Sequence, residues 1–484
     1  MAPVDRNGVV SRPCSNVLNS TVHRQECLQA VSFTPSPSSR ARRVVKREAA
    51  GAATVIPAQP ASIGKLAPDS LACSLFLSAR IVSAVRNGSS LTQAFGILRD
   101  HQAAATRAAA QEISYGTLRS HGLGEFFLSR LLDHPLIDAD SESLLLVALY
   151  RLRSRPDAAH TVVDQAVTAA GEFAGGAYKK LVNALLRNYL RQRTTLDAAC
   201  RSDDVACHQH PQWWLQRLRR AYPTEWPHIV AADNSPPPMT LRVNRRRGGV
   251  ADYAARLAAE GFTSRELGGD ALLLDKPVVV DRLPGFADGW VSVQDAGAQL
   301  AGKWLQPVAG QCVLDACAAP GGKTAHLLEM ADIRLTSLDT DRLRAQRISD
   351  NLRRLALSAD VRVADCRDSA SWWDGAPFDA ILADVPCSAS GVVRRHPDAK
   401  YLRRTSDVRR FAQLQSEILD HLWPLLATGG RLLYATCSLF PEENGAQIDA
   451  FLFRHPAARQ QRRQQLLPNA EHDGFFYALL EKSA

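Results

Sequence analysis

The ten cysteines of this 484-residue chain form no C-x-x-C pair and are scattered along its length. A zinc ribbon and a thioredoxin-type redox site therefore find no support, and we expect no bound metal. A disulfide framework is not expected in a chain long enough to build ordinary hydrophobic cores. The thiols are predicted to be free, in the reducing cytoplasm.

Long apolar runs are also missing. No stretch of about 18 apolar residues is present, so we expect no contact with a membrane. Residues 1–67 lack the apolar run of a signal peptide and are rich in Ser, Pro and Arg. This composition partly resembles an organellar transit peptide. We interpret it instead as a disordered basic leader, or as the product of a start codon assigned too early.

The charge and the size limit the class of protein. The net charge is +9 and the pI is about 9.1, which is compatible with a nucleic-acid partner and equally with a solvated surface. With 46% hydrophobic residues, global disorder is not expected. The length predicts two to four domains, and we expect a monomer.

Residues 68–205 are predicted to form an all-α domain, because apolar residues recur at helical spacing from Leu71 to about Thr195. Pro135 and Pro156 interrupt this pattern, as expected of helix ends. The polar faces carry arginines that either contact RNA or are simply solvated: Arg187, Arg191 and Arg193.

A linker region and a small module follow. Residues 206–235 contain Trp213, Trp214 and Trp226, which we interpret as packing residues between domains rather than base-stacking residues. Residues 236–290 are predicted to form a small α+β module. Its expected elements are a strand from Thr240 that ends in Arg245–Arg247, a helix at 250–260, and strands at 271–274 and 278–280.

Residues 291–484 alternate apolar runs with helical segments, which predicts a doubly wound parallel sheet. The five expected strands are Cys312–Ala316, Ile333–Leu338, Val361–Ala364, Phe378–Asp384 and Gly430–Thr436. Ligands bind such sheets at the carboxyl ends of the strands. We therefore expect the residues at those ends to converge: Asp315, Asp339, Asp365, Asp384, Cys387 and Cys437.

The segment Asp315–Thr324 joins the first of these strands to a helix. It lacks the spacing of a P-loop and of a dinucleotide-binding fingerprint, so it predicts only a cofactor loop. Asp339 ends the next strand, about twenty residues after the glycines. A carboxylate there suits a ribose diol, although a helix cap is an equally simple interpretation.

One thiol follows each of two strands, at Cys387 and Cys437. A lone buried cysteine is usually inert, but two thiols facing one cofactor loop suggest chemistry. Cytosine carbon-5 attacks a methyl sulfonium poorly. A thiolate that adds to carbon-6 makes carbon-5 enamine-like and therefore reactive.

Three motifs, Cys317–Lys323, Asp384–Ser388 and Thr436–Ser438, resemble those of the RsmB/Nop/Sun family of RNA 5-methylcytosine methyltransferases and occur in that family's order. Residues 114–119, 181–187 and 211–217 are similar to the NusB-like domain that precedes the catalytic part in bacterial members. The resemblance covers about 70–484. It implies a NusB-like RNA-binding domain, an RRM-like module, and a Rossmann-like class I methyltransferase domain that uses S-adenosylmethionine.

The resemblance also implies roles. Cys437 would be the nucleophile, with Cys387 assisting product release or acting as the base, and Asp384 lining the site. Asp339 would hold the ribose, with Asp341 as a rival, and Asp365 would lie by the adenine. The methionine moiety would be wrapped by the loop Cys317, Ala318, Ala319, Pro320, Gly321, Gly322 and Lys323. Cys366 is interpreted as incidental.

The expected substrate is a single-stranded or flipped cytosine of 16S ribosomal RNA, and not DNA. Four other functions remain as alternatives: a tRNA cytosine-C5 methyltransferase, an amino-group methyltransferase, a catalytically silent ribosome-assembly factor that binds RNA, and an antitermination-type RNA-binding protein. The aromatic residue usual in amino-group enzymes is replaced here by Cys387. The intact cysteines and glycine loop argue against a silent enzyme.

Overall fold

The computed structural model describes residues 64–99 and 103–483. The predicted disordered leader lies almost entirely outside the described residues. Among the described helices, none is both long and apolar enough to cross a membrane.

The N-terminal part is helical, as predicted, and is built around α1 (Leu71–Arg86), which is buried on nearly all sides. α1 packs against α3 (Ala104–Arg119), α5 (Ala139–Ser154) and α6 (Ala159–Ala170). Side chains cap two of these helices: Ser70 accepts from the N–H of Cys73, and Asp138 accepts from Ser141. The remaining helices of this part include α4 (Leu123–Leu131), α7 (Lys179–Ala199) and α8 (Asp204–His208).

Two helices link this domain to the rest of the chain, α9 (Gln212–Ala221) and α10 (Trp226–Asn234). Trp214 of α9 is fully buried, and its ring contacts Phe440 edge-on, with centroids 5.4 Å apart. Trp213 packs against the same phenylalanine. The interpretation of these two tryptophans as packing residues is confirmed.

The small module is an antiparallel sheet in the order β2-β3-β1-β4, with α11 (Val250–Ala259) packed against it. The strands are β1 (Met239–Val243), β2 (Ser264–Gly268), β3 (Ala271–Leu274) and β4 (Val291–Val293). β4 pairs with β1, so this sheet continues past residue 290.

The strand predicted at residues 278–280 is wrong. Residues 277–279 have no regular structure, and a 3-10 turn begins at Val280. Pro277 has no N–H to give to a ladder, the N–H of Val278 donates to the sulfur of Met239, and Val279 is exposed. The free edge of β1 is taken by β4 instead.

The C-terminal domain contains a seven-stranded sheet in the order β10-β11-β9-β8-β5-β6-β7. The five predicted parallel strands are confirmed as β5 (Cys312–Asp315), β6 (Arg334–Asp339), β7 (Asp360–Val363), β8 (Phe378–Asp384) and β9 (Leu426–Thr436). Two antiparallel strands complete the sheet, β10 (Ala458–Leu466) and β11 (Phe475–Lys482).

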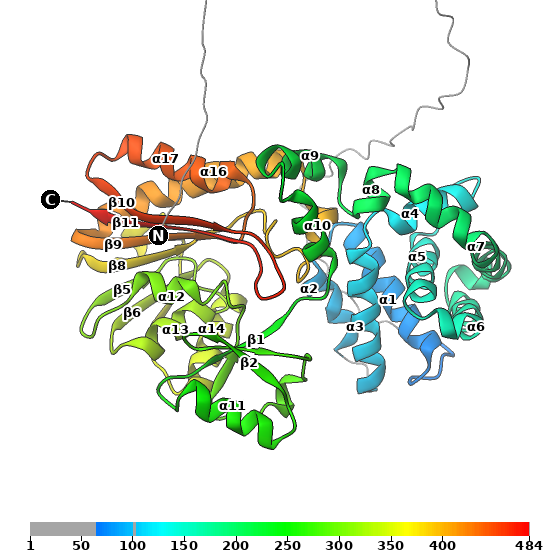
Figure 1. Cartoon of the computed structure of the whole chain (residues 1–484), viewed down its shortest axis with the longest axis horizontal. Coiled ribbons are helices and arrows are strands. Elements are labelled where there is room, and N and C mark those ends of the chain that lie inside the picture. The colour runs from blue at the N-terminus through cyan, green and yellow to red at the C-terminus, as the bar shows by residue number, and fades with distance from the viewer. Residues whose placement is uncertain (1–63, 100–102, 484) are drawn as a thin grey trace, which may run out of the picture. The chain divides into compact units, whose positions relative to one another are not determined.

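Helices cover both faces of this sheet (Figure 1). One apolar core contains residues of α16 (Thr405–Leu422) and α17 (Gly445–Arg454). The core on the other face contains residues of α12 (Leu300–Leu305), α13 (Gly322–Met330) and α14 (Arg342–Leu355). Neighbours in a strand face opposite cores, as Val313 and Leu314 do. This two-sided burial explains why the parallel strands are continuous apolar runs.

Candidate active site

The loop after β5 is shaped by close packing against α14. Gly321 has a φ of +92°, and a Cβ at this position would lie 3.1 Å from the Cα of Ile348. Beneath the loop, the hydroxyl of Thr324 donates to Oδ2 of Asp315 at 2.7 Å. Burial raises the pKa of Asp315 to about 7. Asp315 therefore supports the loop from below, and does not line the cavity.

Asp339 and Asp365 lie at the ends of neighbouring strands, and each has an arginine beside it. Oδ2 of Asp339 accepts from the N–H of Ala319 at 3.3 Å and lies 3.4 Å from Arg344. Hydrogen bonds from Arg367 lower the pKa of Asp365 and hold its carboxylate. Both acids therefore reach the same edge of the sheet.

A cavity of about 360 Å³ opens at this edge, within the range of small-ligand sites. Of the predicted residues, those that line it are Cys317, Ala319, Asp339, Asp365, Asp384, Cys387 and Cys437. Ala318, Pro320, Gly321, Gly322 and Lys323 do not line it. The rival ligand Asp341 caps α14 by accepting from the N–H groups of residues 343 and 344.

Sequence reasoning missed several of the lining residues: Arg344, Arg367, Leu414 and Ile418. Leu414 and Ile418 lie one helical turn apart on α16, and only the position of that helix brings them to the site. Cys366, interpreted as incidental, also lines the cavity. A hydrogen bond with Cys366, followed by burial, raises the pKa of Cys317 well above its usual range.

The two thiols meet. The sulfurs of Cys387 and Cys437 lie 3.3 Å apart, although fifty residues separate them in the chain. Cys437 follows directly on β9, whereas Cys387 lies three residues beyond β8 in a loop without helix or strand. The hydrogen bond with Cys437, followed by burial, raises the pKa of Cys387 well above its usual range.

Lys323 does not line the cavity, but its ammonium lies beside Asp384, which does. Its Nζ donates to Oδ2 of Asp384 at 2.5 Å. Burial alone would lower the pKa of Lys323, but the charge and hydrogen bond of Asp384, with the charge of Cys437, raise it overall. The result is a buried positive charge beside one carboxylate and one thiol.

The small module is tied to the cofactor loop by a fully buried arginine on β1. Both Nε and Nη2 of Arg242 donate to the carboxylate of Glu329 on α13, each at 2.8 Å. Its Nη1 donates to the carbonyl of Gly322 at 2.7 Å and to Gln294. The first turn of α13 is thus held from outside the catalytic sheet.

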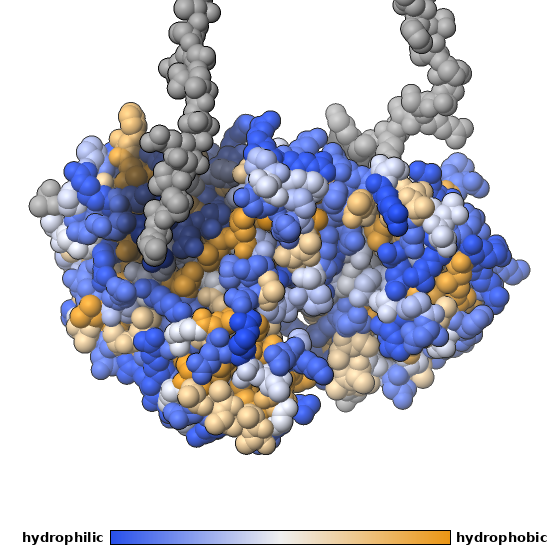
Figure 2. Space-filling view, in the orientation of Figure 1, coloured by the Kyte–Doolittle hydropathy of each residue, from blue (hydrophilic) through white to orange (hydrophobic). Residues whose placement is uncertain are grey.

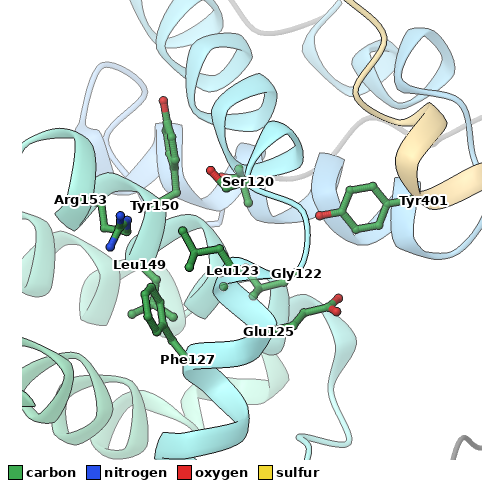
Figure 3. Close-up of a pocket in the computed structure, with 12 residues that line it drawn as sticks. Ser120, Gly122, Leu123, Glu125, Phe127, Leu149, Tyr150, Arg153 and Tyr401 are labelled. Atoms are coloured by element: carbon green, nitrogen blue, oxygen red, sulfur yellow. The ribbon is translucent and has the colours of Figure 1, made fainter. Parts of the chain in front are cut away.

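A second cavity, in the helical domain, is too small for a substrate. Figure 3 shows it between helices, with Leu123, Phe127 and Leu149 around it and Tyr401 reaching towards it from the catalytic domain. Its volume of about 20 Å³ is space for about one water molecule. We assign the chemistry to the cavity of about 360 Å³, because the two thiols and three strand-end aspartates line it.

Comparisons with known proteins agree with this division of the chain. Residues 302–481 match the family "16S rRNA methyltransferase RsmB/F". Residues 210–281 match the ferredoxin-like domain of RsmF/B-like methyltransferases, and residues 77–191 match the NusB family.

Two relatives extend over most of the chain. Ribosomal RNA small subunit methyltransferase B of Vibrio cholerae is 46% identical over 396 residues, which cover 79% of this chain and 90% of the relative. The protein of the same name from Escherichia coli strain K12 is 42% identical over 412 residues, covering 82% and 96%. The crystal structure of PH0851 has a TM-score of 0.71 at 22% identity, covering 87% of this chain and 100% of that chain, and shows a shared fold.

Proposed function

Because the chain belongs to the RsmB/F family of 16S rRNA methyltransferases, we propose that it transfers a methyl group from S-adenosylmethionine to carbon-5 of a cytosine in 16S ribosomal RNA. The observation that carries this proposal is the 3.3 Å contact between the sulfurs of Cys387 and Cys437, which line one cavity together with three aspartates. A methyl transfer to an exocyclic amine needs no thiol, whereas one to carbon-5 needs a nucleophile at carbon-6.

The residues around the cavity fit the cofactor. Asp339 offers a carboxylate for the ribose hydroxyls, and Asp365 lies at the next strand end, where the adenine is expected. Leu414 and Ile418 add an apolar wall against which a flat base can pack. When bound, S-adenosylmethionine supplies an electrophilic methyl group on a positively charged sulfonium.

The protein groups then activate the cytosine. The sulfur of Cys437 adds to carbon-6, which places electron density on carbon-5. Lys323 keeps a positive charge beside Cys437, as an attacking thiolate requires. Asp384, fixed by Lys323, contacts the cytosine ring. Carbon-5 then takes the methyl group and loses its proton to a base, for which Cys387 is the candidate. The bond between carbon-6 and sulfur breaks in the same elimination and returns Cys437.

The contact between the two thiols supports this order of events. The hydrogen bond with Cys437, followed by burial, raises the pKa of Cys387, so Cys387 begins as a thiol. Once Cys437 is bonded to carbon-6, Cys387 loses this hydrogen-bond partner. Cys387 is then placed to take part in proton removal and release.

The target base leaves its stack to reach the thiols, and the flanking domains hold the RNA. Hydrophilic side chains cover most of the helical domain on the face in view in Figure 2. A groove of about 460 Å³ between α6 and α7 is lined by Arg187 and Arg191, both exposed, and by His160. These groups suit the phosphate backbone.

The test is methylation of 16S ribosomal RNA from cells that lack the gene, followed by digestion to nucleosides. The wild-type protein should yield 5-methylcytidine. Cys437→Ala should lower the rate by about three orders of magnitude or more while cofactor binding survives. Cys207→Ala, at an exposed thiol outside the cavity, is the control. Methylation of an exocyclic amine, or full activity of Cys437→Ala, would exclude the proposed reaction.

A further inference from the structure

The residue that joins the two thiol loops is Glu443, the last residue of a short 3-10 turn that follows β9. Glu443 is fully buried. Ser388 is the next residue after Cys387, and Ser438 is the next after Cys437. Both serines are also fully buried, so each thiol has a neighbour that points into the protein.

One carboxylate receives hydrogen bonds from both loops. Oε1 of Glu443 accepts from the backbone N–H of Ser388 at 2.7 Å, and Oε2 accepts from the Ser388 hydroxyl at 2.5 Å. Oε2 also accepts from the hydroxyl of Ser438 at 2.5 Å. Gln415 on α16 donates to Oε1 at 3.3 Å. The hydroxyls of Ser388 and Ser438 lie 3.1 Å apart, which closes the network.

The Cys387 loop has no regular secondary structure of its own to hold Cys387 in position. Residues 385–398 contain no helix or strand, and Ala389 has a φ of +60°, a region that costs a residue with a Cβ about 1 kcal/mol. Cys437, in contrast, is held by the end of β9. A backbone hydrogen bond from the N–H of Gly391 to the carbonyl of Cys437 at 2.8 Å joins the two segments, and Glu443 adds three hydrogen bonds to Ser388 and Ser438.

We propose that Glu443 is a positioning residue that holds the Cys387 and Cys437 sulfurs in contact, so that the thiol that attacks the base and the thiol that assists its release act on one cytosine. The claim that both thiols act on one cytosine rests on the proposed function. The claim that Glu443 holds the two sulfurs in contact concerns the protein alone. It can be tested without RNA or cofactor.

Two substitutions of Glu443 distinguish the effect of side-chain length from the effect of the negative charge. Glu443→Gln keeps the length of the side chain, and its amide can still bridge the backbone N–H and the hydroxyls. Glu443→Asp keeps the carboxylate but is one methylene shorter, so it cannot reach both loops. Glu442→Asp is the matched control, because Glu442 is the preceding residue, half exposed, and pairs with Arg217 at the surface.

The first measurement is the rate at which diamide links Cys387 to Cys437, followed by mass spectrometry of the joined peptides. Two thiols lose their hydrogens to the N=N bond of diamide, which becomes a hydrazine, and an S–S bond forms. Glu443→Gln and Glu442→Asp should link at close to the wild-type rate. Glu443→Asp should link at least tenfold more slowly, with the thermal midpoint measured alongside.

The second measurement follows turnover on 16S ribosomal RNA. Glu443→Asp should lower kcat with little change in the KM for RNA, and should accumulate a denaturation-resistant protein–RNA adduct. Rapid linking in Glu443→Asp, or equally slow linking in Glu443→Gln at an unchanged thermal midpoint, would overturn the inference. If Glu443→Asp does not fold, Ser388→Ala replaces it. Ser388→Ala removes one hydroxyl only and must then slow the linking of Cys387 to Cys437.

Wild-type protein that links the two cysteines rapidly but makes no 5-methylcytidine would count against the proposed function alone.

Discussion

Cys387 acts after Cys437 in the proposed cycle, so removing its thiol should stop the reaction at a defined point. In Cys387→Ala, Cys437 can still add to carbon-6 and the methyl group can still be transferred, but release of the base is slowed. We expect a covalent protein–RNA adduct that survives denaturing electrophoresis, with multiple turnover reduced by about two orders of magnitude or more.

The matched control is Cys366→Ala, because Cys366 is a buried thiol that lines the same cavity. This variant should turn over without accumulating adduct. Rapid turnover of Cys387→Ala with no adduct would contradict the release role.

At the residue scale, the sequence predicts which acids and thiols lie at the strand ends, but it does not predict their hydrogen-bond and ion-pair partners. Lys323 is predicted as part of the cofactor loop, yet its ammonium lies against Asp384. Glu443 carries no motif-like signal of its own, because a glutamate seven residues beyond the end of β9 is usually solvated. The direction in which a side chain points depends on packing, which neighbouring residues in the sequence do not specify.

At the element scale, the contact between β1 and α13 links the small module to the helix that follows the loop after β5. Arg242 has 0% of its side chain exposed and Glu329 has 2%, so removing one partner leaves the other charge buried and unpaired. Arg242→Met should lower the free energy of unfolding by about 3–5 kcal/mol. It should also weaken S-adenosylmethionine binding, because the carbonyl of Gly322 loses its donor.

Urea unfolding and calorimetric titration with S-adenosylmethionine measure these two effects. Arg246→Met is the control: Arg246 is 39% exposed and pairs with Asp332, so its loss should cost within about 1 kcal/mol. Unchanged cofactor affinity in Arg242→Met would show that the module does not support the loop.

Two elements illustrate what periodicity could not predict. The strand expected at 278–280 is absent because Pro277 precedes it and another segment takes the edge of β1. Strand β10 was not expected, because its sequence is nearly all arginine and glutamine and most of its residues are exposed. An edge strand can be this polar, since one side pairs with β11 and charge discourages further pairing.

At the scale of the whole molecule, the helical domain is attached to the end of the Cys387 loop and to the short helix that follows it, Ala399–Leu402. Nζ of Lys400 donates to the carbonyl of Arg119 on α3, and Arg119 donates to the carbonyl of Arg394. The N–H of Leu91 donates to Asp398 at 3.0 Å. Residues 394–400 therefore connect the helical domain to the catalytic domain.

Buried neutral histidines predict acid sensitivity of the fold. Burial lowers the pKa of His326 to about 4 and that of His210 well below its usual range. Below about pH 6.5 the unfolded chain binds protons that the folded protein does not bind. Stability is therefore fully present above that pH. The contribution of His326 should fall by roughly 1.4 kcal/mol per pH unit as pH drops from 6.5 towards 4, and His210 adds a loss in the same direction.

Unfolding midpoints at pH 7.5, 6.0 and 5.0 measure this loss. His326→Gln should lessen the dependence on pH, whereas His134→Gln, at an exposed position, should leave it unchanged. An identical pH dependence of stability in the wild-type protein and in His326→Gln would contradict the attribution of acid sensitivity to His326.

The sequence by itself determined the helical, small α+β and parallel-sheet parts, and the set of acids and thiols at the strand ends. It could do so because apolar periodicity follows from burial, and because the carboxyl ends of parallel strands share one edge. Only the tertiary structure decided that the Cys387 and Cys437 sulfurs are in contact, that Glu443 joins their loops, and that Arg242 forms an ion pair with Glu329 on α13. Each of these contacts joins segments from different elements, many of them far apart in the chain, and each depends on distances of a few ångströms that only the packed fold fixes.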